Sequence, residues 1–217
     1  AARRAHRRRA DVKVLTDSLP EEPEYALVRE SRNAALLVTG TRGRGGMAEA
    51  LLGSVSLTVA GHAHCPMVIV RGSHDNAVRP GGRIVVGVGE GAPVRFAFEE
   101  ARLRGASVEA VRAWRSPARE TTDHPLLAGE PARLHEQEAA QALEKALRGM
   151  PADVEVHRRV VEGHARTVLA DASRDADLLI VGARRRTRHF GLQLGRVAHG
   201  VLHHSVCPVA VVPERDG

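Results

Sequence analysis

The chain has 217 residues, of which 43% are hydrophobic and 27% are charged. This composition is typical of a globular protein with a sizeable core and excludes a wholly disordered chain. No apolar run approaches the roughly 18 to 20 residues that cross a bilayer, so we expect no membrane partner. The Arg-rich segment 1–10 lacks the apolar stretch of a signal peptide. The two cysteines exclude a disulfide framework and favour a cytoplasmic location.

The formal net charge of +6 raises the question of nucleic-acid binding. Aromatic residues make up only 2% of the chain, too few for a platform on which bases stack. Acidic residues are also dispersed among the basic ones. We therefore expect no nucleic-acid partner.

An internal repeat organises the chain. When the sequence is shifted by 142 residues, Asp11–Val70 aligns with Asp153–Val212 without a gap, and 20 of the 60 positions are identical. The two segments are therefore two copies of one structural unit. The identical positions include the pairs Gly40 and Gly182, Gly53 and Gly195, and Cys65-Pro66 and Cys207-Pro208.

The second copy alternates short apolar runs with amphipathic segments. The runs predict strands over Ile84–Val88, Val108–Trp114, Val154–Val161, Leu178–Val181 and Val209–Val212. The amphipathic segments predict helices over Val94–Arg104, Pro131–Arg148, Ala165–Ser173 and Leu192–His203. This alternation predicts an α/β fold, a doubly wound five-stranded parallel sheet of strand order 3-2-1-4-5.

The first copy supplies only the back half of this unit. Its pattern predicts strands over Val12–Thr16, Leu36–Thr39 and Met67–Val70, and helices over Pro23–Ser31 and Ala48–Gly61. Few residues precede Asp11, and the chain opens with Ala rather than Met, so we expect a tandem repeat whose first copy is truncated. We expect residues 1–72 to form the C-terminal half of a first domain, 73–82 a linker, and 83–217 a complete second domain.

A glycine-rich turn follows the fourth strand of the first copy, at the edge of the sheet where doubly wound folds bind ligands. It reads Gly40-Thr41-Arg42-Gly43-Arg44-Gly45-Gly46, and the next helix carries Gly53-Ser54-Val55-Ser56. Glycines let the backbone approach a ligand and adopt positive φ, and exposed N–H groups bind anions. The hydroxyls of Ser54 and Ser56 suit phosphate oxygens. The alternative is that these glycines form only a tight turn and a helix-packing contact.

The spacing Gly40-x2-Gly43-x9-Gly53-Ser54, followed by the strand Cys65-Pro66-Met67-Val68-Ile69-Val70, resembles the ATP-binding subgroup of the universal stress protein family. The likeness covers nearly the whole chain, as in tandem members of that family. It implies an adenine nucleotide, ATP with or without Mg²⁺, held between the first-strand loop and the glycine-rich turn. On this chain the phosphate contacts would be Gly40, Arg42, Gly43, Gly53, Ser54, Val55 and Ser56.

The second copy departs from this motif. Arg185 and Arg196 stand where the first copy has Gly43 and Ser54, and Gly89 stands where the family usually has aspartate. A side chain at position 185 would occupy the place where backbone meets phosphate, so we expect a degenerate site. The alternative is that the two arginines bind anions as point charges. In the first copy the motif is complete, but the first two strands are missing from this chain.

Other candidate sites are weaker. The groups His62, His64, Cys65 and His203, His204, Cys207 contain metal-ligand types, but each offers too few ligands, so we expect no metal. The chain has no Walker-type lysine motif and no Gly-x-Ser-x-Gly sequence, so we expect no catalytic residue and at most slow ATP hydrolysis.

Two functional hypotheses follow. The first is a stress-response protein that binds ATP as a sensor or regulator rather than as a fast enzyme. The second is a nucleotide-independent dimerisation scaffold of the same fold. The resemblance implies that the fifth strands bring two units together, either in a homodimer or in an intramolecular pseudo-dimer, with Val209–Val212 as the interface.

Overall fold

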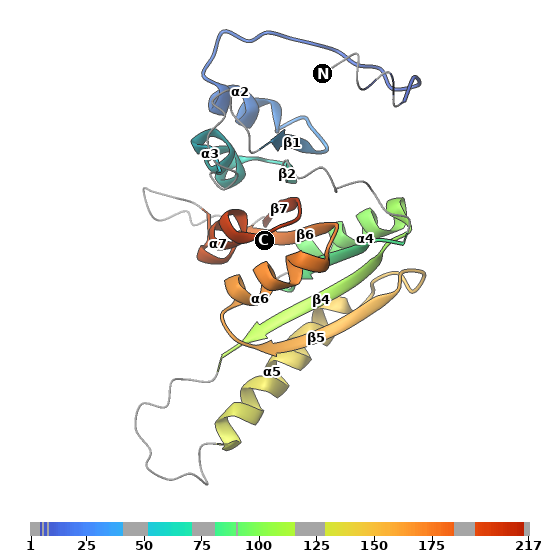
Figure 1. Cartoon of the computed structure of the whole chain (residues 1–217), viewed down its shortest axis with the longest axis vertical. Coiled ribbons are helices and arrows are strands. Elements are labelled where there is room, and N and C mark those ends of the chain that lie inside the picture. Colours follow the sequence, from blue (N-terminus) through green and yellow to red (C-terminus); the bar gives the residue numbers. More distant parts are fainter. Residues whose placement is uncertain are drawn as a thin grey trace.

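The structure is a computed structural model that describes residues 5, 7, 9–40, 52–70, 81–89, 91–115, 129–184 and 194–214 (Figure 1). The first copy contains α2 (Pro23–Glu30), β1 (Leu37–Gly40), α3 (Ser54–His62) and β2 (Met67–Val70). The second copy contains β3 (Arg83–Gly87), α4 (Ala92–Arg104), β4 (Ser107–Trp114), α5 (Gly129–Leu147), β5 (Val156–Glu162), α6 (Ala165–Ala172), the short 3₁₀ helix η1 (Ser173–Asp175), β6 (Leu178–Arg184), α7 (Arg196–His204) and β7 (Val209–Glu214).

All the described strands belong to one seven-stranded sheet, in the order β1-β2-β7-β6-β3-β4-β5. The prediction of a separate five-stranded parallel sheet is therefore wrong for the sheet as a whole. The five strands of the second copy do lie in the order 3-2-1-4-5 within it, and they pair in parallel.

The two copies join through their fifth strands. β2 pairs with β7 antiparallel, with Val68 opposite Ala210, and this pair makes the sheet mixed. The pairing has a simple cause, because β7 alone would expose a row of unpaired backbone N–H and C=O groups along one edge. The intramolecular version of the expected fifth-strand interface is thus present in the structure.

Helices cover the sheet from both sides, as Figure 1 shows for α6 and α7 on one side and α5 on the other. Side chains alternate along each strand, so every central strand supplies apolar residues to both faces. Val181 and Val211 belong to the core under α3, α6 and α7, which we call the α7 face. Ile180 and Ala210 belong to the core under α4 and α5, which we call the α4 face.

The segment Val12–Thr16 is not a strand, contrary to the prediction. In the order 3-2-1-4-5 a third strand pairs only with a second strand, and the 217 residues contain no second strand for the first copy. Without that partner its backbone hydrogen bonds cannot form a ladder. Its side chains are accordingly open to solvent, with Leu15 80% exposed.

Two helices begin later than their apolar patterns predict. α3 starts at Ser54 rather than Ala48, and α7 starts at Arg196 rather than Leu192. Residues 48–51 and 192–193 of the two predicted helices lie outside the described residues. Gly53 and Gly195 have extended backbones, with ψ of 149° and 151°. Each glycine is therefore the last non-helical residue before its helix begins. The buried Leu52 and Leu194 lie just before these helices and extend the apolar pattern.

A buried serine bridge recurs in both copies. The Ser31 hydroxyl donates to the carbonyl of Val28 at 2.6 Å and accepts from the amide of His64 at 2.9 Å. The Ser173 hydroxyl makes the same pair of bonds, with Ala170 at 2.6 Å and Val206 at 2.9 Å. In each copy the bridge ties the end of one helix to the chain just before the fifth strand.

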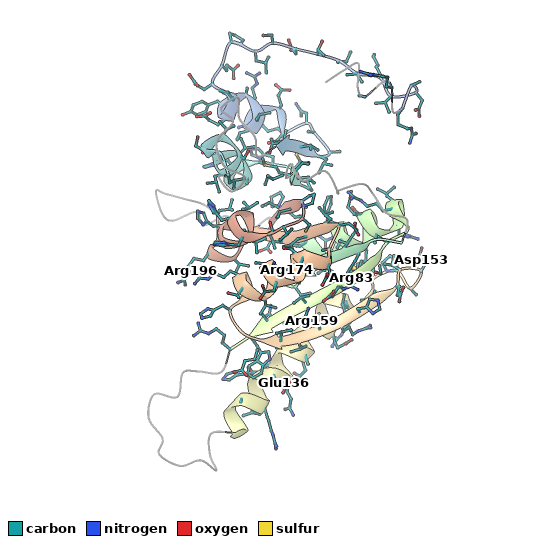
Figure 2. All side chains as sticks on the ribbon, viewed as in Figure 1. Arg83, Glu136, Asp153, Arg159, Arg174 and Arg196 are labelled. Carbon is teal, nitrogen blue, oxygen red and sulfur yellow. The ribbon has the colours of Figure 1, made fainter. Side chains whose placement is uncertain are left out.

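A buried ion pair crosses three strands at the other end of the sheet. The Glu109 side chain on β4 is 9% exposed, and its carboxylate accepts from Arg83 on β3 at 3.3 Å and from Arg159 on β5 at 3.1 Å. Both arginines, labelled in Figure 2, are about half-exposed. The network therefore links the three neighbouring strands β3, β4 and β5 through one buried carboxylate.

Candidate functional site

The candidate site of the first copy lies where β1 ends and α3 begins. β1 and β2 are parallel and α3 connects them, so α3 runs back against the strands and its N-terminus lies near the carboxyl end of β1. Gly40 is the last residue of β1, and Gly53 immediately precedes α3. Arg42 and Gly43, the other two residues expected at this site, lie outside the described residues.

The N-terminal turn of α3 presents backbone amides. Gly53 has no side chain to accept from them, and within the described part of the chain no side chain caps this end. Uncapped amides and the positive end of the helix dipole together attract anions. A Cβ built on Gly40 or Gly53 would meet no atom of the described residues within 4 Å.

The three residues after Gly53 differ in exposure. Ser54 is exposed at the first position of α3, whereas Val55 is half-buried against the α7-face core. Ser56 is only 6% exposed. Of the two predicted hydroxyl donors, only that of Ser54 stands open to solvent at the helix terminus.

Gly40 and Gly53 differ from other residues here by their lack of a side chain and not by unusual dihedral angles. Gly53 has φ of −64°, and among the described glycines only Gly81, Gly105, Gly149 and Gly163 have positive φ. Gly40 and Gly53 therefore do not use the positive φ that glycine tolerates. What the missing side chains leave is space beside the backbone.

Thr39 is a polar residue that the sequence analysis missed. Its Oγ1 atom is buried and has no hydrogen-bond partner among the residues that the structure describes. Thr39 precedes Gly40 on β1, and the equivalent residue of the second copy is the buried Val181. Comparing the two copies position by position would have identified this hydroxyl in an otherwise apolar strand.

The second copy repeats the backbone of this site but not its side chains. Gly195 precedes α7 with φ −61° and ψ 151°, close to the −64° and 149° of Gly53. Arg196, labelled in Figure 2, is exposed at the first position of α7 and replaces Ser54. Arg185 lies outside the described residues. The two copies thus have a similar backbone before the helix but different first helical residues, a serine hydroxyl in one and an arginine in the other.

The histidine and cysteine groups do not converge. Among the described residues no three His, Cys, Asp or Glu side chains could hold a metal ion together. Cys65 and Cys207 are buried and precede strands that run antiparallel to each other, so they lie at opposite ends of the β2–β7 pair. Burial raises the pKa of the Cys65 thiol.

The acidic residues near α4 and α5 take part in local pairs. Glu100 pairs with Arg104 one turn along α4, and the Nδ1 atom of His135 lies 3.2 Å from a Glu138 carboxylate oxygen on α5. Both are pairs between neighbouring turns of a helix. None of the helices in the described ranges is long and apolar enough to cross a membrane.

Comparisons with known proteins agree with the fold. The universal stress protein family matches residues 1–71 and 82–213. The universal stress protein Rv1996 of Mycobacterium tuberculosis is 34% identical over 195 residues, which cover 85% of this chain and 61% of that protein. A universal stress protein of Mycolicibacterium smegmatis is 30% identical over 211 residues, covering 93% and 69%. The chain therefore spans about 61% of the length of the first of these relatives.

Solved structures show the same fold. The protein PA1789 of Pseudomonas aeruginosa matches 98% of this chain and 75% of its own, with a TM-score of 0.68 and 18% identity. A universal stress protein of Archaeoglobus fulgidus matches 94% and 70%, with a TM-score of 0.62 and 18% identity. The chain belongs to the universal stress protein family.

Proposed function

We propose that this chain is part of a stress-response protein that binds an adenine nucleotide, ATP with or without Mg²⁺, at the glycine-rich turn of its first copy. Binding serves sensing or regulation in the cytoplasm rather than rapid turnover. The nucleotide phosphates would lie on the turn and on the first turn of α3, at Gly40, Arg42, Gly43 and Gly53–Ser56.

The observation that carries this proposal is the open N-terminal turn of α3. Backbone amides that no described side chain caps lie beside Gly53, and the exposed Ser54 hydroxyl adds a donor at the same place. A phosphate group accepts hydrogen bonds from such a terminus and is attracted by its dipole. No atom of the described residues would lie within 4 Å of a Cβ on Gly40 or Gly53, which is consistent with a ligand close to the backbone.

Thr39 supports the same position independently. A buried hydroxyl without a partner costs about 1–3 kcal/mol of stability, and no described residue bonds to the Thr39 Oγ1 atom. It lies one residue before Gly40, at the carboxyl end of β1. A polar ligand atom or an ordered water in the crevice would satisfy it.

The test is titration of ATP, with and without Mg²⁺, into the longest form of the protein that contains these residues. We expect saturable binding that Ser54→Arg weakens at least about tenfold, because this change gives the first copy the residue of the second. The matched control is Arg196→Ser, the reverse exchange, which should leave the affinity unchanged. Absent binding, or equal binding by Ser54→Arg and the parent protein at preserved thermal stability, refutes the proposal.

The second candidate function, a nucleotide-independent scaffold, is favoured by the β2–β7 pair. This pair already joins two copies of the fold into one sheet without any ligand. Light scattering after size exclusion would show whether chains also form a homodimer. An intact sheet without nucleotide binding would favour this second function.

A further inference from the structure

Glu214 fills the crevice of the second copy that corresponds to the candidate site of the first. A Cβ built on Gly182, at the carboxyl side of β6, would overlap the Oε1 atom of Glu214 and lie 2.9 Å from its carboxyl carbon. A Cβ on Gly89, just after β3, would lie 3.6 Å from the same oxygen. The carboxylate of Glu214 thus rests between the ends of β3 and β6, where the strand order of a doubly wound sheet reverses.

The surroundings of this carboxylate favour an anion. A hollow of about 420 Å³ opens beside it, lined by Arg95, the first residues of α4, the end of β7 and two residues of the first copy, His64 and Pro66. Gly91 precedes the 13-residue α4, and no side chain in the described ranges caps that helix. Arg95 brings positive charge, and the terminus of α4 brings positive partial charge, toward the hollow.

The two copies carry different residues at the position of Glu214. At the repeat offset of 142 residues, Glu214 corresponds to Gly72 and Gly182 corresponds to Gly40. Gly72 has no side chain that could fill a crevice, and a Cβ on Gly40 would meet no described atom within 4 Å. No described residue of the first copy supplies an acid beside Gly40, while the second copy supplies one from its own fifth strand.

We propose that the Glu214 carboxylate is a built-in anion that occupies the second crevice and keeps phosphate-bearing ligands out of it. Its charge repels an incoming phosphate, and its side chain takes the space beside Gly182 that the backbone leaves open. Glu214 is then a specificity-determining residue that makes the two copies unequal in binding. The inference rests on the proposed function only in taking the crevice at the carboxyl ends of the strands as the place for anions.

The experiment uses inorganic pyrophosphate as the probe and the Ser54→Arg chain as the parent, so that the first copy does not contribute. Glu214→Gln keeps the shape of the side chain but removes its charge. Glu214→Gly introduces the residue that the first copy has at the equivalent position, Gly72. Glu162→Gln is the matched control, because Glu162 is also a glutamate at the end of a strand, β5, and is exposed. Binding is measured by calorimetry and located by the amide NMR shifts of Gly182 and Gly89.

We expect both Glu214 variants to bind pyrophosphate at least about tenfold more tightly than the parent and Glu162→Gln, with shifts at Gly182 and Gly89. Unchanged affinity in folded Glu214→Gln, or tighter binding without shifts at these glycines, overturns the inference. If Glu214→Gly fails to fold, the isosteric Glu214→Gln decides. Loss of ATP binding on Ser54→Arg is a separate measurement, so failure of this inference leaves the proposed function standing, and the reverse also holds.

Discussion

The buried serine bridge of the second copy gives a quantitative prediction about stability. Ser173 is 0% exposed and bonds the Ala170 carbonyl and the Val206 amide. Ser173→Ala removes both bonds, although the amide belongs to Val206, a residue that is 51% exposed. Each intramolecular hydrogen bond contributes about 0.5–1.5 kcal/mol, so we take about 2 kcal/mol for the loss of both. For a chain of this size that loss lowers the melting temperature by roughly 4 to 8 °C.

The measurement is thermal and urea unfolding followed by circular dichroism. Thr167→Ala is the control, because Thr167 lies exposed on α6, the helix that Ser173 ends, and its loss should change stability by no more than about 0.5 kcal/mol. Ser31→Ala makes the equivalent change in the first copy, and the double variant should show roughly the sum of the two effects. Equal melting temperatures for Ser173→Ala and Thr167→Ala would show that the bridge does not hold the helix to the fifth strand.

Three further predictions concern other parts of the fold. Glu109→Gln should cost about 1–2 kcal/mol in urea unfolding, because the carboxylate is buried but its partners Arg83 and Arg159 are half-exposed and solvated. Gly105→Ala should cost about 1 kcal/mol, since this residue ends α4 at φ 62°; an unchanged urea midpoint would contradict that role. The pKa of the buried Cys65 thiol is raised, so the stability it contributes is present below its unfolded pKa and is lost as pH rises through the folded pKa. The melting temperature should therefore fall less between pH 7 and about pH 10 in Cys65→Ala than in the parent, and parallel curves would exclude this contribution.

The sequence predicted most of the second copy because each of its strands finds its neighbours within the same copy. Apolar runs such as Leu178–Val181 pair on both sides and are covered on both faces, so local pattern and final environment agree. The same pattern at Val12–Thr16 failed because a strand also needs a partner, which a local pattern does not reveal. The join between β2 and β7 was anticipated from the family resemblance, whereas its merging of both copies into one sheet was not.

The candidate site was predictable in its glycines and less so in its polar groups. Gly40 and Gly53 lie at the end of β1 and just before α3, at the edge of the sheet where the carboxyl ends of parallel strands meet. Thr39 and Glu214 were not found, because the surroundings of their side chains depend on packing that the sequence does not show. Both become visible only when a residue is compared with its counterpart in the other copy, namely Val181 and Gly72.

The exposed apolar residues near β1 follow from the same strand order. Leu36, Val38 and Val70 are 38%, 57% and 39% exposed, and their alternation places them on the α4 face. In the second copy, α4 and α5 cover this face, and β3 pairs with the open side of the strand equivalent to β1. The first copy within these 217 residues has no counterpart of β3, α4 or α5. The exposed strip is the face that α4 and α5 cover in the second copy. A charged residue at Val38, which is 57% exposed, should therefore leave the melting temperature of the protein unchanged.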